Sequence, residues 1–101
     1  MSLELLAKQE PSVIQALYRL KDEVFRDGAL TTKEKELIVL GISIATHCEP
    51  CILVHMEKAL VAGATRAEIL EACGIAIAMG GGPAMAYVPY VLKYLEEHSA
   101  E

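Results

Sequence analysis

The chain has few of the residues that cross-link or rigidify a small protein. Among its 101 residues there is no tryptophan, one phenylalanine and only three cysteines, too few for a disulfide scaffold. Positive charge is also scarce, because nine lysines and arginines stand against 14 aspartates and glutamates, for a net charge of −5. With no basic block either, this balance argues against nucleic acid or an anionic membrane surface as the main partner.

Long apolar runs are missing as well. None reaches the roughly 18 residues that suggest a membrane span. The N-terminal stretch has no basic region, and Glu4 interrupts its short apolar run, so we expect no signal peptide and no membrane partner. We therefore expect a cytoplasmic protein. In a reducing compartment a CxxC pattern indicates redox chemistry or metal binding rather than a structural cross-link.

Apolar side chains, in contrast, are abundant. The hydrophobic residue types make up 53% of the sequence, which is a large share for so short a chain. At this length folding hides only about two-thirds of the surface of the unfolded chain. We therefore expect one domain over residues 1–101 that associates with further copies of itself as a homo-oligomer.

The apolar residues recur at helical spacing, and no alternating strand pattern is bounded by turn residues. Capping-box patterns, Thr31 with Glu34 and Thr65 with Glu68, each indicate a helix start. The sequence predicts an all-α fold with helices at about 11–27, 31–45, 50–62, 65–79 and 83–97. The glycines at 80–82 must break the chain between the last two, and Pro89 is expected to kink or divide the final helix.

Two cysteines and a histidine lie around the predicted start of the third helix. Pro50 favours the first helical turn, so Cys48 falls near the N-cap and Cys51 lies three residues later, within small adjustment of a disulfide. The free backbone N–H groups and the helix dipole stabilise a thiolate there. His55 follows Cys51 by four residues, on the same helical face, where an imidazole can take the thiol proton.

The lengths of two predicted helices indicate that Glu36 lies close to His55. It lies roughly 16 Å before the turn near residue 47, and His55 lies roughly 11 Å beyond that turn, at 1.5 Å per residue. An antiparallel hairpin would therefore bring the two side chains within reach of each other. A carboxylate behind the histidine would set its tautomer and raise its basicity.

The joint pattern of Glu36, Cys48, Cys51 and His55, within LGISIATHCEPCILVHMEKALVAGAT, resembles the carboxymuconolactone decarboxylase superfamily, and specifically its alkylhydroperoxidase D-like (AhpD-like) branch. The resemblance implies an all-helical fold built around a helical hairpin that carries the CxxC at a helix N-terminus. It also implies trimers, hexamers or similar homo-oligomers. The true decarboxylases lack the cysteine pair, which argues against lactone decarboxylation.

The resemblance implies an enzyme, a peroxidase or oxidoreductase that needs no cofactor, with a peroxide or small disulfide as substrate and a thiol reductant as partner. Carried over from the family's motif, Cys51 attacks the peroxide and Cys48 resolves the oxidised Cys51. His55 is the base and Glu36 orients it. The best-known peroxidase members carry a second histidine just before the second cysteine, where this chain has Pro50. His47 is not at the matching position.

Two other interpretations compete with the redox one. Zinc could be held by Cys48, Cys51 and His55 with Glu36 or His47, in a non-enzymatic oligomeric module. Alternatively, the cysteines form a buried pair with an incidental histidine. The third cysteine, Cys73, lies in an apolar helix and is expected to pack as a small hydrophobic residue.

Overall fold

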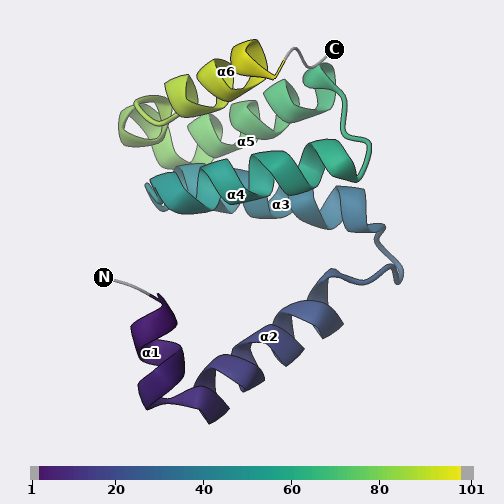
Figure 1. The fold of residues 1–101 in the computed structure, drawn as a ribbon. Helices are drawn as coiled ribbons and strands as arrows, with labels where there is room; N and C mark the ends of the chain where they lie inside the picture. The colour runs from purple at the N-terminus through teal and green to yellow at the C-terminus, as the bar shows by residue number, and fades with distance from the viewer. Residues whose placement is uncertain (1–2, 99–101) are drawn as a thin grey trace.

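The computed structural model describes residues 3–98, which form six helices (Figure 1). No strand occurs within this range, so the predicted all-α fold is confirmed. The helices are α1 (Leu3–Gln9), α2 (Pro11–Phe25), α3 (Thr32–Ala45), α4 (Glu49–Val61), α5 (Arg66–Met85) and α6 (Val88–Glu97).

Helices α3 to α6 form the body of the molecule. The α3–α4 hairpin packs against α5, and α6 lies over α4 and α5 (Figure 1). Each of these four helices contributes to one core, because apolar residues at helical spacing give each of them a face to bury. The largest fully buried side chains are Leu40, Ile44, Ile52, Met56, Ile69, Val91 and Leu95.

Both predicted capping boxes are present. The hydroxyl groups of Thr31 and Thr65 accept hydrogen bonds from the backbone N–H groups of Glu34 and Glu68, each at 3.1 Å. The two carboxylates accept in return from the threonine N–H groups at 2.8 Å. These backbone hydrogen bonds lower the pKa of both glutamates. The first turns of α3 and α5 are thus held by side chains close in the sequence.

Helix α1 was not predicted from the sequence. It has no buried residue, and its start carries no capping pattern that would have announced it. It ends at Gln9 because Glu10 precedes Pro11, and a proline disfavours helical backbone in the residue before it. Glu10 accordingly has φ −135° and ψ 63°. The predicted helix from Pro11 is confirmed as α2, although it ends at Phe25.

The predicted break in the glycine run lies at Gly81, which has φ 68° and ψ −150°, a conformation that glycine adopts at little cost. The chain then continues helically only to Met85, so the helix predicted from residue 83 to residue 97 is divided, as the sequence led us to expect. The final helix begins instead at Val88, with Pro89 in its first turn, where a missing N–H costs nothing. Pro89 therefore lies just after the division between α5 and α6.

Helices α1 and α2 stand away from the body, and we refer to residues 3–25 as the arm (Figure 1). Within α2 only Ile14 is buried. Among residues 3–98, no single helix has the length and apolar character to cross a membrane; α5 and α6 meet that test only together, across a bend of 102°.

Candidate active site

The turn between α3 and α4 places Cys48 at the N-cap of α4, as the sequence predicted. His47 reverses the chain with φ 59°, in the left-handed region, and the Cys48 N–H donates to the Ser43 carbonyl at 3.0 Å. The Cys48 sulfur then accepts a hydrogen bond from the Cys51 N–H at 3.3 Å. The sulfur thus occupies the position that a serine or threonine oxygen takes at other helix starts.

Cys48 and Cys51 are joined in a disulfide, with their Cα atoms 5.3 Å apart. Both residues are partly exposed, so a small molecule in solution can reach the pair. When the bond is reduced, the first-turn N–H groups and the positive end of the α4 dipole lie where they stabilise a thiolate. The position therefore suits a cysteine pair that alternates between dithiol and disulfide.

The hairpin brings Glu36 of α3 to His55 of α4, which confirms the distance argument made from the sequence. The histidine Nδ1 lies 2.7 Å from the glutamate Oε1, and the two side chains are only 13% and 4% exposed. A proton on Nδ1 satisfies the buried carboxylate, which leaves Nε2 as the nitrogen able to accept another proton. The arrangement is that of a base held by a carboxylate.

Phe25, at the end of the arm, is a neighbour of His55 that sequence reasoning missed. Its ring stacks on the imidazole, with centroids 5.7 Å apart. The backbone there is held by two side chains of α3: the Thr32 hydroxyl donates to the Phe25 carbonyl at 2.8 Å, and Lys35 donates to the Val24 and Arg26 carbonyls. In the sequence Phe25 was only one more apolar position on a helix, with nothing to link it to a residue 30 positions later.

On the other side of the cysteine pair, His47 belongs to an aromatic cluster. Its ring stacks on Tyr87 with centroids 4.9 Å apart, and Tyr87 lies 5.6 Å from Tyr90. The charge of Glu49 raises the pKa of Tyr90. The α5–α6 connection therefore contacts the turn that carries Cys48, which the sequence could not indicate.

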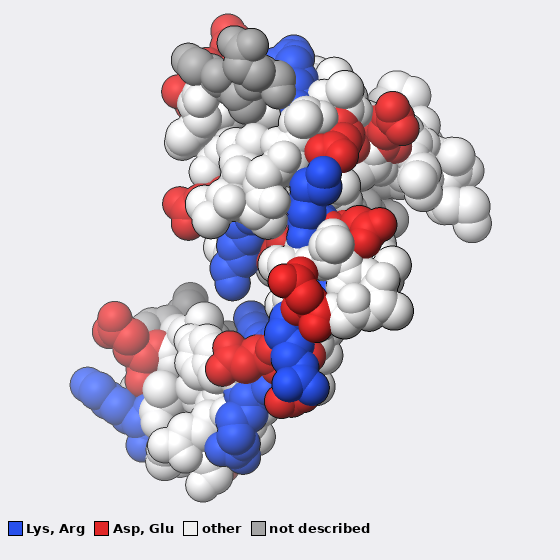
Figure 2. Space-filling model, turned by 90° about the vertical axis from the view of Figure 1, so that its right-hand side faces the viewer, with Lys and Arg blue, Asp and Glu red and all other residues white. Residues whose placement is uncertain are grey.

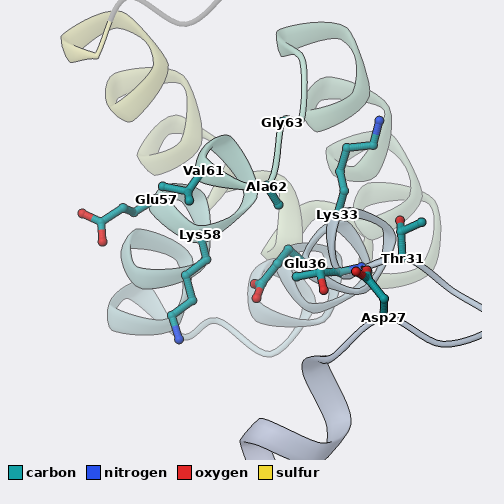
Figure 3. Close-up of a pocket in the computed structure, with 10 residues that line it drawn as sticks. Asp27, Thr31, Lys33, Glu36, Glu57, Lys58, Val61, Ala62 and Gly63 are labelled. Carbon is teal, nitrogen blue, oxygen red and sulfur yellow. The ribbon is translucent and has the colours of Figure 1, made fainter.

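A hollow of about 780 Å³ lies between the start of α3 and the end of α4. Glu36 lines it, together with Asp27 from the loop before α3, whereas the Glu57 carboxylate points outward (Figure 3). Neither cysteine nor His55 is among its lining residues. The hollow therefore lies on the Glu36 side of the histidine–glutamate pair and does not border the sulfur atoms.

Cys73 is buried and free, as predicted for a packed residue, and burial raises the pKa of its thiol to about 11. It is therefore a poor nucleophile at neutral pH. Within residues 3–98 no group of three or more histidine, cysteine, aspartate or glutamate side chains is arranged to hold a metal ion. The described part of the chain thus holds no cluster of ligands of the kind that the zinc interpretation requires.

These features define a class: an all-α hairpin protein with a cysteine pair at a helix N-terminus and a buried histidine–glutamate pair one turn further on. The model of the carboxymuconolactone decarboxylase family matches residues 11–96. The chain belongs to this family.

Several proteins are similar to this chain in sequence, and some of them have solved structures with a similar fold. A carboxymuconolactone decarboxylase family protein from Legionella pneumophila has a crystal structure with a TM-score of 0.88 and 37% identity, covering 94% of this chain and 85% of its own. A family member from Thermotoga maritima has a TM-score of 0.80 and 32% identity, covering 85% and 89%. An uncharacterized protein of Cupriavidus necator is 33% identical over 95 residues, 94% of this chain and 84% of its own length.

Proposed function

We propose that this protein is a thiol-dependent redox enzyme, a peroxidase or oxidoreductase of the AhpD-like type. It reduces peroxides, or exchanges disulfides, through Cys48 and Cys51. The observation that carries the proposal is the cysteine pair, bonded at the N-terminus of α4, with His55 one turn along the same helix and Glu36 of α3 paired with it. Involvement in an antioxidative response has been suggested for the Thermotoga maritima relative. We place the activity in the cytoplasm, where thiol reductants are present.

In the oxidative half of the reaction, His55 takes the proton from the Cys51 thiol. The thiolate attacks the terminal peroxide oxygen, the O–O bond breaks, and the leaving alkoxide takes the proton from the imidazolium to give an alcohol. Cys51 is now a sulfenic acid. The Cys48 thiolate attacks its sulfur and the S–O bond breaks. The hydroxide takes up the proton that the Cys48 thiol gave up and leaves as water, and the disulfide forms.

Glu36 serves this step without touching the substrate. Its carboxylate fixes the proton on Nδ1 of His55, so that Nε2 is the basic nitrogen, and it stabilises the imidazolium that forms after proton transfer. Phe25, stacked on the ring, limits its rotation.

The reductive half needs an external thiol reductant. One thiolate of the reductant attacks a sulfur of the Cys48–Cys51 bond, giving a mixed disulfide and one free protein thiolate. A second thiolate then attacks the reductant's sulfur, restores the dithiol and leaves the reductant oxidised. With a disulfide in place of the peroxide as substrate, the same two exchanges run in the opposite direction.

The experiment is a peroxide-consumption assay with several mono- and dithiol reductants. With reductant, wild-type protein should turn over many times and Cys51→Ser should not react; without reductant, Cys48→Ser should consume one equivalent of peroxide and stop. Cys73→Ser is the matched control and should behave as wild type, because that thiol is buried. A protein that consumes no peroxide but is oxidised by small disulfides would be an exchange enzyme. Peroxide consumption unchanged in Cys51→Ser would overturn the proposal.

A further inference from the structure

Helices α3 and α4 end in the same turn, built on a histidine in one case and on a glycine in the other. After α4, Gly63 has φ 95°; its N–H donates to the carbonyl three residues back at 3.0 Å, and the next N–H donates five residues back at 2.9 Å. After α3, His47 has φ 59°, and the corresponding hydrogen bonds measure 3.2 and 3.0 Å. Glycine is the usual residue at this position, because a Cβ atom is strained at positive φ. The histidine therefore costs stability, and strain of this kind beside a reactive group points to a use for the side chain.

The ring of His47 is held next to the cysteine pair. It stacks on Tyr87 with 11° between the ring planes, and Tyr87 packs against the core. The α3–α4 turn and the α5–α6 connection lie at the same end of the body, which makes this contact possible (Figure 1). His47 directly precedes Cys48, whereas His55 follows Cys51 by four residues. Each of the two cysteines thus has a histidine of its own.

The surroundings of Cys48 offer a negative charge and few sources of a positive one. Glu49 follows it directly, and a carboxylate disfavours a second negative charge beside it. No lysine or arginine occurs within residues 36–57 or 67–92, the segments that contain the α3–α4 turn and the α5–α6 connection. On the face shown in Figure 2, lysine and arginine side chains are interspersed with acidic ones, so no basic patch there supplies the charge. In these two segments only a histidine can supply it.

We propose, on the basis of the proposed function, that protonated His47 stabilises the thiolate of Cys48. The resolving step keeps its chemistry: the Cys48 thiolate attacks the Cys51 sulfur, the S–O bond breaks, and the hydroxide recovers the proton that the Cys48 thiol lost. When a reductant attacks Cys51, the same charge stabilises Cys48 as the leaving thiolate. His47 thus acts on the closing and opening of the disulfide. The first attack on peroxide remains with Cys51, because the leaving oxygen there takes its proton from His55.

The test measures alkylation of Cys48 by iodoacetamide in Cys51→Ser protein, by mass spectrometry at pH 6 and at pH 9. An imidazole carries its charge at pH 6 and has lost it at pH 9. Adding His47→Gly should therefore slow alkylation about threefold or more at pH 6, the effect of a unit charge roughly 6 Å away in water, and leave it unchanged at pH 9. The other charged or titratable groups around the turn are common to all the proteins compared: Glu36, Glu49, His55, Tyr87 and Tyr90.

Three further measurements serve as controls. Circular dichroism should show that His47→Gly folds, because glycine adopts this φ without strain, as Gly63 does. His47→Arg is charged at both pH values, so alkylation should be as fast as with His47 at pH 6 and faster at pH 9. His98→Gly is the matched control, since His98 is another exposed histidine stacked on a tyrosine, Tyr94, but at the C-terminal end of α6. It should leave alkylation unchanged.

In the protein with both cysteines and no reductant, His47→Gly should leave the first attack on peroxide unchanged. It should prolong the life of the Cys51 sulfenic acid at pH 6, so that a dimedone-type reagent captures more of it. Alkylation of Cys48 that is unchanged at pH 6, slowed equally at both pH values, or not restored by His47→Arg would overturn the proposal, as would an unchanged sulfenic acid lifetime. Alkylation needs no peroxide, so a protein that consumes none would contradict the proposed function separately.

Discussion

Two kinds of side-chain cap hold helix starts in the body of this protein. Helices α3 and α5 begin at Thr31 and Thr65, whose hydroxyl groups cap the first turn in reciprocal capping boxes. Helix α4 begins at Cys48, whose sulfur accepts the corresponding backbone hydrogen bond. The three caps solve the same problem, an unpaired N–H in the first turn, with different atoms.

The two kinds of cap serve different purposes: the hydroxyl caps stabilise a helix, whereas the sulfur cap is suited to a reaction. Sulfur is a weaker hydrogen-bond acceptor than a hydroxyl oxygen, so a cysteine is a poor choice if stability alone is required. It is a good choice if the helix start must stabilise a thiolate and release it to bond a second sulfur. The proposed function therefore predicts that changes at α4 alter reactivity, whereas changes at α3 and α5 alter stability.

The largest expected effect concerns the base beside the cysteine cap. His55→Gln should slow the reaction of the thiol with peroxide by roughly 100-fold or more, the usual contribution of a positioned base. The glutamine amide can still donate to Glu36, so the buried carboxylate keeps a partner and the variant should fold. Stopped-flow measurement of the first turnover gives the rate. A rate equal to wild type would remove His55 from the mechanism.

Glu36→Gln should slow the same step by less, because the side chain keeps its shape and loses only the charge behind the imidazole. The plot of thiol alkylation rate against pH is the better readout, since a purely structural role would leave it unmoved. We expect the apparent pKa of the reactive thiol to rise in this variant, because the imidazolium that pairs with the thiolate is less stable.

The hairpin and its cysteine pair could be predicted because their determinants are local. Thr31 with Glu34 and Pro50 after Cys48 each act on one helical turn, and helix rise then placed Glu36 opposite His55. The stacking of Phe25 on His55 and of His47 on Tyr87 could not be predicted. It depends on how helices distant in the sequence cross, which periodicity does not specify.

The next effect is on stability. Thr65→Ala should lower the free energy of unfolding by about 1 kcal/mol, the usual cost of removing an N-cap. Cys48→Ser, compared with the reduced wild type, should cost nothing or stabilise, because serine is a strong N-cap. Denaturant unfolding in excess reductant measures both. A large loss of stability in Cys48→Ser would mean that the sulfur is needed for folding. It would contradict the distinction between caps for stability and a cap for reactivity.

A smaller effect should appear with pH. Hydrogen bonds lower the pKa of Glu68 in the folded state, so its contribution to stability is present above the unfolded pKa of about 4.3. The contribution is lost as the pH falls through the lower folded value. The stability difference between wild type and Glu68→Gln should therefore shrink as the pH falls below about 4. Unfolding curves between neutral and acid pH test this, and a constant difference would contradict it.

The smallest effect concerns the cysteine away from any helix start. Cys73 should resist alkylation at neutral pH in the folded, reduced protein, because its thiol is buried and has a pKa of about 11. Mass spectrometry after brief iodoacetamide treatment should find label on Cys48 and Cys51 first. Label on Cys73 at a similar rate would show that helix position does not control reactivity here.

The most direct test of the account is to trap the sulfenic acid in Cys48→Ser and in Cys51→Ser with a dimedone-type reagent after one equivalent of peroxide. The account predicts label on Cys51 in the Cys48→Ser protein and none on Cys48 in the Cys51→Ser protein. Label on Cys48 in Cys51→Ser, with none on Cys51 in Cys48→Ser, would contradict it and make the helix-capping sulfur the nucleophile.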